Sequence, residues 1–250
     1  MIQLPALDCH AHIAPDVTAD QLARLVPSVV FAVTRWPDEA KQVAYRKDQR
    51  IVWGLGVHPS RVARGETPDL AAVRELLPQF ALVGEIGLDR RSGNLALQVS
   101  VLRQVLSLAT DQPVILSVHS NGAVDELLEL LEEAPRTGVV LHWFNGAPSQ
   151  IDRAVRLGCY FSVNAAMEPT KLLQIPSDRL LPETDYPATR RHGGRLPGDT
   201  GTTERLLADL SGSSVEDVRH QSYRNLRAVL LSSGAIDRVS ATISDLVLLV

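Results

Sequence analysis

The chain has 250 residues, of which 45% are hydrophobic, so it is long enough to bury a sizeable core in one domain. Its net charge of −4 excludes attraction of nucleic acid by an overall basic field, and short substrates therefore fit better than tracking along a duplex. We expect a cytoplasmic protein that is not bound to a membrane, because neither a signal-like segment nor an apolar stretch of about 18 residues is present and the two cysteines form no disulfide framework.

Short apolar runs alternate with helical patterns along most of the chain. The predicted strands occupy residues 4–8, 28–34, 51–57, 81–86, 114–119, 139–142, 159–163 and 179–184. The predicted helices between them occupy residues 18–26, 38–48, 69–77, 94–109, 123–133, 149–157 and 170–175. This alternation predicts an α/β protein with parallel strands joined by helical crossovers. Eight such units, with strands rich in Val, Ile and Leu, favour a closed (β/α)8 TIM barrel over an open sheet.

The last quarter of the chain has a different pattern. A loop rich in Pro, Gly and Arg covers residues 187–200, two further helices are predicted near residues 203–210 and 215–231, and a short tail follows. We expect one barrel domain over residues 1–250, with residues 232–250 as a candidate C-terminal extension.

Six residues that could bind a metal lie at or just after the ends of predicted strands. They are His10, His12, Glu85, His119, His142 and Asp185. The carboxyl ends of the strands form the active-site face of a TIM barrel, so these side chains should converge there. The set predicts a hydrolase with two divalent metal ions, and its mixed nitrogen and oxygen ligands suit Zn, Mn or Fe better than Mg, with Mg, Mn and Zn all kept as candidates.

The first of these motifs, Asp8-Cys9-His10-Ala11-His12, closes the first predicted strand. A two-residue period places Asp8, His10 and His12 on one face, with Cys9 on the opposite face toward the helices. A bare His-x-His pair is often incidental, but its position at a strand end favours a metal site. Asp8 is then a candidate acceptor for the ring N–H of His10 or His12, a hydrogen bond that would orient that imidazole toward the metal.

The other candidate ligands differ in how specific they are. Glu85 is flanked by glycines that allow close backbone approach, and it could bridge two cations or simply form a salt bridge. A lone strand-end histidine is usually a hydrogen-bonded core residue, but His119 and His142 lie on adjacent strands and face the same end. Asp185 could bind metal and accept a proton from an attacking water.

Taken together, these motifs resemble the TatD-like metal-dependent hydrolases, many of them described as deoxyribonucleases, over nearly the whole chain. The matching segments are residues 8–12, 56–59, 84–89, 119–120, 141–146 and 183–185. The resemblance implies that His10, His12, Glu85 and Asp185 hold one cation and that Glu85, His119 and His142 hold the second. It further implies that a bound water or hydroxide attacks a phosphodiester, with DNA as the expected nucleic acid.

The same family motif places His58 at the end of the third strand, close to the expected metals. We expect it to contact a substrate phosphate or to transfer a proton, which makes it a catalytic candidate beside Asp185 and Glu85. The alternative is a hydrogen-bonded loop histidine before Pro59. Two shorter segments, residues 116–120 and 157–164, look most similar to the branch found in Qat anti-phage defence operons, which implies an antiviral role and partner proteins from such an operon.

The surroundings of the centre differ from what is common in the family. Asn121 stands where relatives often carry arginine, and Arg90 and Arg91 stand where aromatic residues are common. The basic residues, with Lys171 on another loop, are candidate phosphate contacts, and the alternative is that they are solvated loop charges. Tyr160 and Asn164 lie on one face of the seventh predicted strand and could also line the pocket. The full set of predicted substrate contacts is therefore Arg90, Arg91, Asn121, Lys171, Tyr160 and Asn164. Trp143 could stack on a base or pack in the core.

Two further functions compete with a nuclease. The same ligand set could hydrolyse an amide, a lactone or another ester, as in the wider amidohydrolase superfamily, although a bridging lysine that is common there is replaced by Glu85. Alternatively, the chain could be a nuclease-like subunit that is active only within a multi-protein defence complex.

Overall fold

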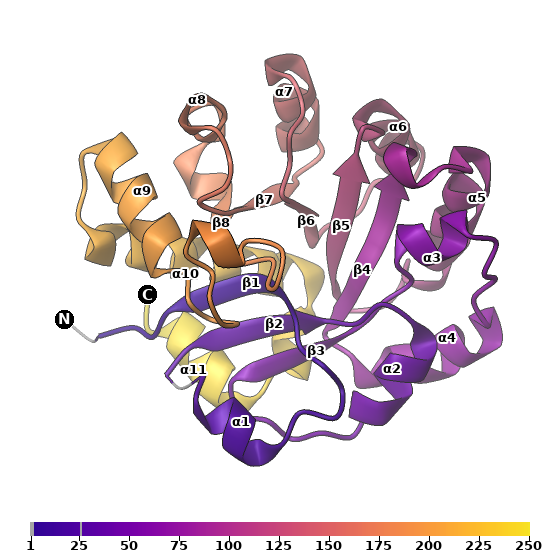
Figure 1. Cartoon of the computed structure of the whole chain (residues 1–250), viewed down its shortest axis with the longest axis horizontal. Helices are drawn as coiled ribbons and strands as arrows, with labels where there is room; N and C mark the ends of the chain where they lie inside the picture. Colours follow the sequence, from indigo (N-terminus) through magenta and orange to yellow (C-terminus); the bar gives the residue numbers. More distant parts are fainter. Residues whose placement is uncertain (1–2, 26) are drawn as a thin grey trace.

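The computed structural model describes residues 3–25 and 27–250. Eight parallel strands follow one another around a nearly closed barrel with helices outside it, which confirms the predicted (β/α)8 fold (Figure 1). The strands are β1 (Leu7–His12), β2 (Val29–Val33), β3 (Ile51–Leu55), β4 (Leu82–Asp89), β5 (Ile115–Asn121), β6 (Val139–His142), β7 (Tyr160–Val163) and β8 (Leu180–Pro182). Each strand pairs in parallel with the next in the chain.

The barrel closes between β1 and the segment that follows β8. The Asp185 amide donates to the His10 carbonyl at 2.8 Å, and the His12 amide donates to the Tyr186 carbonyl at 2.9 Å. These two hydrogen bonds place Asp185, which follows β8, beside the histidines of β1.

The helices follow the predicted alternation with shorter bounds in places. They are α1 (Ala19–Ala23), α2 (Pro37–Val43), α3 (Pro59–Ala63), α4 (Leu70–Leu76), α5 (Leu95–Leu108), α6 (Val124–Glu133), α7 (Pro148–Arg156), α8 (Pro169–Leu172), α9 (Gly201–Ser211), α10 (Val215–Ser233) and α11 (Ala241–Leu248). The helix predicted over residues 18–26 ends at Ala23, and the last residue of that prediction, Val26, lies outside the described residues. The sequence patterns did not indicate α3 or α11. No described helix is both long enough and apolar enough to span a membrane.

Two apolar clusters occupy the two faces of the sheet. The outer cluster lies between the strands and the surrounding helices. The inner cluster contains alternate strand residues such as Leu7, Ile115 and Val140, together with Tyr223 and Leu226 of α10. The C-terminal helices therefore pack against the interior side of the barrel, behind the strands in Figure 1.

Residues 232–250, expected to form a short tail or extension, carry a short 3-10 turn and α11. Ile243 and Val247 of α11 are fully buried in the inner cluster. This segment therefore contributes to the core rather than extending into solvent.

The predicted orientation of Cys9 is wrong. The pairing of β1 with β2 shifts register between Asp8 and Ala11, so a strict two-residue period does not hold through this motif. Cys9 packs in the inner cluster with Leu7 instead of facing the helices. Burial raises the pKa of its thiol well above the usual range, so Cys9 is an unreactive packing residue.

Candidate metal centre

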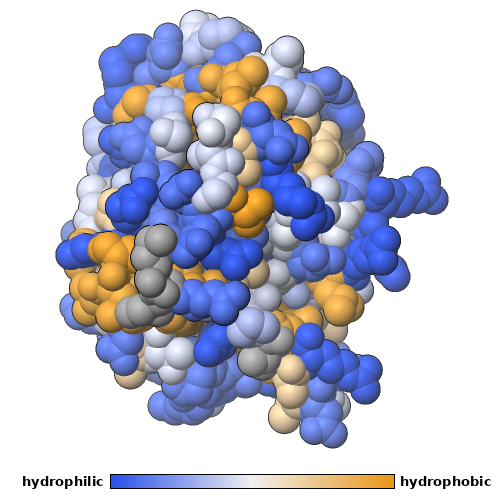
Figure 2. Space-filling model, turned by 90° about the vertical axis from the view of Figure 1, so that its left-hand side faces the viewer, coloured by the Kyte–Doolittle hydropathy of each residue, from blue (hydrophilic) through white to orange (hydrophobic). Residues whose placement is uncertain are grey.

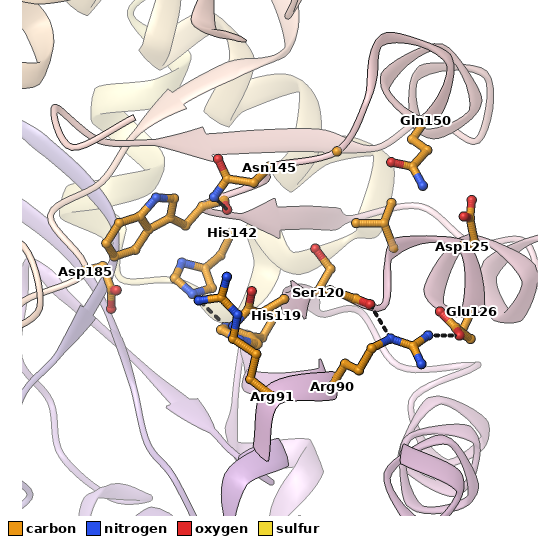
Figure 3. A pocket seen from close by; sticks show the side chains of 15 residues that line it. Arg90, Arg91, His119, Ser120, Asp125, Glu126, His142, Asn145, Gln150 and Asp185 are labelled. Carbon is orange, nitrogen blue, oxygen red and sulfur yellow. Dashed lines mark hydrogen bonds and ion pairs between the residues drawn. The ribbon is translucent and has the colours of Figure 1, made fainter. Parts of the chain in front are cut away.

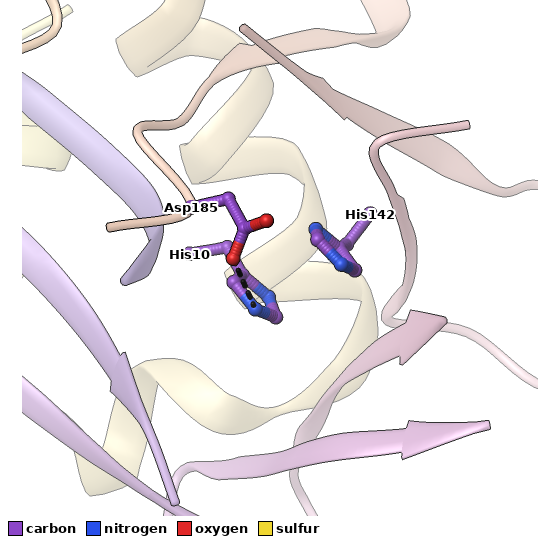
Figure 4. A group of neighbouring side chains, drawn as sticks. All are labelled: His10, His142 and Asp185. Carbon is purple, nitrogen blue, oxygen red and sulfur yellow. Dashed lines mark ion pairs between the residues drawn. The ribbon is translucent and has the colours of Figure 1, made fainter. Parts of the chain in front are cut away.

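All six predicted ligands meet at the carboxyl ends of the strands. They form three overlapping groups, within each of which the candidate ligand atoms lie within 4.8 Å of one another. The groups are His10, His12 and Glu85; Glu85, His119 and His142; and His10, His142 and Asp185. Figure 4 shows the last group, in which the imidazoles of His10 and His142 stack at 3.7 Å between ring centres.

Glu85 lies at the middle of the cluster, with imidazoles on both of its oxygens. Its Oε2 lies 3.1 Å from His12 Nε2 and 3.7 Å from His10 Nε2. Its Oε1 lies 2.9 Å from His119 Nδ1 and 3.5 Å from His142 Nε2. Each oxygen therefore faces its own pair of candidate ligand histidines, and His58 is a third imidazole near Oε2. A carboxylate placed in this way can bridge two cations.

Asp185 lies beside His10 and His12 in the cluster. Its Oδ1 lies 3.8 Å from the Nε2 atoms of both His10 and His12. Its backbone has a φ of 42°, a left-handed conformation that is uncommon for residues other than glycine. Such conformations persist where surrounding contacts enforce them, and here the hydrogen bond to His10 does so.

The donor atoms present fit a divalent cation. His10 Nε2 is buried without any hydrogen-bond partner, while the Nδ1 atom of the same ring is 2.8 Å from the Ser117 hydroxyl. Burial lowers the pKa of His10 well below its usual range, so the ring is neutral and has a lone pair available. A buried lone pair of this kind is costly unless a cation or another donor occupies it.

The expectation that Asp8 orients a histidine ring is not met. Its carboxylate accepts hydrogen bonds from the Thr184 amide at 2.8 Å, the Thr184 hydroxyl at 2.6 Å, the Gly198 amide at 2.7 Å and the His10 amide at 3.3 Å. Asp8 is in register with Val30 of β2, whose side chain packs in the outer cluster, and the register shift of β1 lies after Asp8, so its side chain does not share a face with the histidines that follow. Asp8 therefore fixes the backbone on both sides of the junction between β1 and the segment after β8. The residue that contacts the His10 ring is Ser117, which the sequence did not indicate.

The two carboxylates of the centre ionise differently. Burial raises the pKa of Asp185 to about 8, although nearby His142 opposes the shift. Burial would also raise the pKa of Glu85, but the histidines around it, His58 first, hold it well below its usual range. Near neutral pH, without a cation, Glu85 is ionised and Asp185 holds a proton.

Glu183 is a buried residue of the centre to which the sequence assigned no role. Its carboxylate lies 3.2 Å from His142 Nδ1, accepts from Asn164 Nδ2 at 2.8 Å and accepts from the Ser162 hydroxyl. Burial would lower the pKa of His142, but Glu183 outweighs burial and raises it well above the usual range. This contact directs His142 Nε2 toward Glu85. Its position two residues before Asp185 was the available signal, although that position does not indicate which side chain Glu183 contacts.

Two predicted substrate contacts of the seventh strand do not line the pocket. Asn164 is buried, and its amide group bonds Glu183 on one side and the Ala166 amide at 3.0 Å on the other. Tyr160 begins β7 and packs in the inner cluster, with the Arg179 guanidinium 5.0 Å from its ring centre. The strand period indicated the correct face, but it did not indicate the depth of each residue in the barrel.

His58 is the hydrogen-bonded loop histidine that the sequence offered as an alternative, and its expected contact with a substrate phosphate or role in proton transfer stays a prediction. Its Nδ1 accepts from the Ser60 amide at 3.1 Å at the start of α3, and its Nε2 lies 3.1 Å from Glu85 Oε2. A backbone amide can only donate, so Nδ1 is unprotonated and Nε2 carries the hydrogen. His58 is thus a hydrogen-bonded loop histidine that also donates into the centre.

A pocket of about 620 Å³ opens beside the centre (Figure 3). His119, His142 and Asp185 line its inner end. Of the predicted substrate contacts, Arg90, Arg91 and Asn121 line it, as does Trp143.

Lys171 is not among the residues that line this pocket. Its Nζ donates to the carbonyl of Asn145 at 2.7 Å, and Asn145 is itself a lining residue. Lys171 therefore supports the pocket wall from behind.

Comparisons with known proteins agree on one family. A family model described as "TatD related DNase" matches residues 7–231. The human deoxyribonuclease TATDN3 is 29% identical over 252 residues, covering 88% of this chain and 92% of the relative. The "3'-5' ssDNA/RNA exonuclease TatD" of Cronobacter sakazakii is 28% identical over 191 residues, covering 70% and 73% respectively. A Bacillus subtilis relative, YabD, is described as a metal-dependent hydrolase and is 28% identical over 194 residues, covering 71% and 76%.

The solved structures agree on the fold. The crystal structure of the TatD homologue YJJV from Escherichia coli has a TM-score of 0.76 and 22% sequence identity, covering 90% of this chain and 97% of that chain.

Proposed function

The chain belongs to the TatD-related DNase family, and from this premise we propose that it is a divalent-metal-dependent phosphodiester hydrolase that acts on nucleic acid, with DNA as its principal substrate. The observation that carries the proposal is the Glu85 carboxylate, which has one pair of imidazoles on each oxygen. A single bridging carboxylate between two sets of ligands is typical of two-metal hydrolases.

We assign the ligands according to these contacts. His10, His12, Glu85 and Asp185 hold one cation, and Glu85, His119 and His142 hold the other. When bound, two such cations lower the pKa of a water molecule, orient the phosphoryl group and neutralise charge on the leaving oxygen. The mixed nitrogen and oxygen donors accept Mn or Zn as readily as Mg.

The protein's own groups have separate tasks in the reaction. Asp185 takes the proton of the attacking water, because it lies at the strand ends beside His10 and His12 and lines the inner end of the pocket. His58 donates through Nε2 to an oxygen of the substrate phosphate or of Glu85. His142 is held in place by Glu183, which acts as a positioning residue.

The pocket suits a single strand with an unpaired base. Trp143 lines it beside His142 and is only partly buried, so one face of the indole can stack on a base. The name of the Cronobacter relative, an exonuclease of single-stranded DNA and RNA, supports the same substrate class. The net charge of −4 also favours short strands over long duplexes.

A substrate panel tests this proposal. Labelled single-stranded DNA, single-stranded RNA and duplex DNA are incubated with the metal-free chain and added Mn²⁺, Mg²⁺ or Zn²⁺, beside a simple amide, a lactone and a carboxylic ester. We expect cation-dependent cleavage of the single strands, fastest for DNA. Turnover of the amide, lactone or ester without any oligonucleotide cleavage would favour the amidohydrolase alternative instead.

We also propose that the chain serves in anti-phage defence with partner proteins. Support comes from the resemblance of residues 116–120 and 157–164 to the branch found in Qat operons. These segments include Ser117 and Asn164, which contact His10 and Glu183 around the centre. Co-purification with products of neighbouring genes, with faster cleavage on their addition, is the expected result. Full activity of the isolated chain, unchanged by those proteins, would contradict a function that depends on a complex.

A further inference from the structure

We propose that Arg91 is the one cation of the pocket that binds a phosphate next to the scissile one, because Glu126 holds the neighbouring Arg90 away from the substrate. The proposal rests on the proposed phosphodiesterase function. It identifies the substrate class more narrowly, as a short or terminal piece of strand with one flanking phosphate in the pocket.

The two arginines sit on a tightly held 3-10 turn, η2 (Arg90–Ser92), directly after β4. The Asp89 carboxylate accepts from the Arg91 amide at 2.9 Å and from the Ser92 hydroxyl at 2.7 Å. The Gln98 side chain accepts from the Asp89 amide at 2.7 Å and donates to its carbonyl at 2.9 Å. The turn is therefore fixed from several sides, and the direction of each arginine follows from it.

Asn121 belongs to the same network. Asn121 is the last residue of β5, and its Nδ2 donates to Asp89 Oδ1 at 3.2 Å. The predicted substrate contact at this position is thus engaged with the turn that carries the arginines, and we assign it as a positioning residue for them.

The guanidinium groups of the two arginines have different surroundings. Arg90 donates through Nε to the Gly122 carbonyl at 2.6 Å and forms an ion pair with Glu126 of α6. Arg91 has no side-chain hydrogen bond or ion pair within residues 3–25 and 27–250. In Figure 3, Arg91 extends toward the end of the pocket that contains His119 and His142, whereas Arg90 extends the other way, to Glu126.

The remaining charges along the pocket wall are also compensated. Asp125 pairs with Arg153, with Nη1 and Oδ1 3.0 Å apart. Asn145 and Gln150 contribute neutral amides to the outer wall. Beyond the metal centre, Arg91 is therefore the uncompensated charge on the pocket wall that the structure describes.

One uncompensated arginine predicts one phosphate contact. A guanidinium that pairs with phosphate forms a charge-assisted hydrogen bond, which contributes more than a neutral one. Each such contact to a single strand adds about 0.7 to the slope of log affinity against log salt concentration. The pocket should therefore bind a strand with a shallow salt dependence, and a longer strand should gain little affinity from its additional phosphates.

Trinucleotides with a single neutral linkage test this. Each of two isomeric DNA trimers carries one phosphodiester and one methylphosphonate, and they are compared with the all-phosphodiester trimer in the presence of Mn²⁺. The methylphosphonate resists cleavage, so the remaining phosphodiester is the bond that is cut. We expect one isomer to have a kcat/KM about 10-fold or more below that of the parent, since a hydrogen bond to a charged group is lost.

The variants separate the two arginines. Arg91→Gln should cleave the parent trimer and the isomer that the wild type cleaves slowly at the same rate, because the charge of the flanking phosphate no longer has a partner in the pocket. Arg103→Gln is the matched control: this exposed arginine of α5 pairs with Glu133, outside the pocket, and its loss changes the net charge equally. It should retain the wild-type ratio. Glu126→Gln should release Arg90 and steepen the salt dependence of KM.

The outcomes distinguish two failures. If Arg91→Gln discriminates between the trimers as strongly as the wild type and Arg103→Gln, Arg91 is not the flanking contact and the proposal is overturned. An unchanged salt dependence in Glu126→Gln would overturn the part assigned to Glu126. Absence of cleavage of any trimer or longer oligonucleotide by the wild type would instead overturn the phosphodiesterase function itself.

Discussion

Glu85 and Asp185 are both buried carboxylates of one centre, yet their surroundings give them opposite ionisation. Five histidines lie around Glu85 and favour its charged form, while Asp185 contacts the centre from one side and is protonated near neutral pH. Two titratable groups whose pKa values are separated in this way can serve as ligand and base. At the scale of residues, this difference is compatible with the proposed roles, in which Glu85 bridges two cations and Asp185 accepts a proton.

The raised pKa of Asp185 predicts how metal binding depends on pH. A cation at this carboxylate must displace its proton, and a cation at His142, whose pKa is also raised, must displace a second one, so apparent affinity should rise with pH through the region near 8. Asp185 contributes at most about tenfold per pH unit to this rise, the limit for release of one proton. Titration of the metal-free chain with Mn²⁺ at several pH values measures this dependence. A slope that is shallower in Asp185→Asn would identify Asp185 as a titrating group, and an unchanged profile in that variant would refute the assignment.

Glu183 provides a second test, because it acts only through His142. Glu183→Gln keeps the size of the side chain but weakens the contact to His142 Nδ1, so metal affinity should fall by about 10–100-fold. High Mn²⁺ concentrations should restore much of the activity. A variant with wild-type affinity, measured in the same titration, would show that the contact does not orient the ligand.

The sequence predicted which six residues meet at the centre, but not the residues that support them. Each of the six lies at or near the end of a predicted strand and was visible as a polar residue in or after an apolar run, as at His119 and His142. Ser117 and Glu183 lie inside strand patterns, where a polar residue gives no sign of what it contacts. Asp8 was misassigned because a bulge, which has no clear sequence signature here, lies between it and Ala11 and breaks the two-residue period that placed it on the face of the histidines.

Among the elements, β4 determines the spacing of the centre. Gly87 has a φ of 137°, and a Cβ atom there would lie 2.1 Å from the His119 carbonyl oxygen of β5. Gly56 is equally restricted, since a Cβ atom would lie 1.8 Å from the Thr34 carbonyl oxygen. These close approaches allow the strand ends to place Glu85 within reach of histidines from β1, β5 and β6.

Gly87→Ala should therefore disturb the centre without altering any ligand. Backbone strain and overpacking each cost on the order of 1–3 kcal/mol, so thermal unfolding should shift downward and metal affinity should fall. Gly158→Ala is a suitable control, because it also has a positive φ of 78° but nothing lies within 4 Å of an added Cβ. Equal metal affinity in the two variants would show that the close approach at β4 is not needed.

The elements were predicted in order and type, and errors concern short ones. The eight strands and the long helices, such as α5, gave clear periods. α3 has five residues and begins at a His-Pro pair that read as a loop, and α11 follows a turn in a segment read as a tail. Segments this short contain too few apolar positions to distinguish a helix from a loop.

At the scale of the whole molecule, the centre joins distant parts of the chain. β1 contributes two histidines, β4 to β6 contribute three more ligands, and the segment after β8 returns Asp185 to His10 and closes the barrel. A cation that binds these ligands binds only the folded chain, so it should stabilise the fold. Removing it with a chelator should lower Tm, and adding Mn²⁺ should restore it. A Tm that does not respond to either treatment would contradict a centre whose ligands come from distant parts of the chain.

The central claim is that Glu85 joins two cations that the hydrolysis requires. The most direct measurement is the cleavage of a labelled single-stranded oligonucleotide by the metal-free wild type and by Glu85→Gln, each titrated with Mn²⁺ while bound metal is counted and folding is followed by circular dichroism. We predict that the wild type binds two Mn²⁺ per chain and becomes active, whereas the folded variant binds fewer and stays inactive. A folded Glu85→Gln chain with wild-type cleavage, or a wild type that cleaves equally well without metal, would contradict the account.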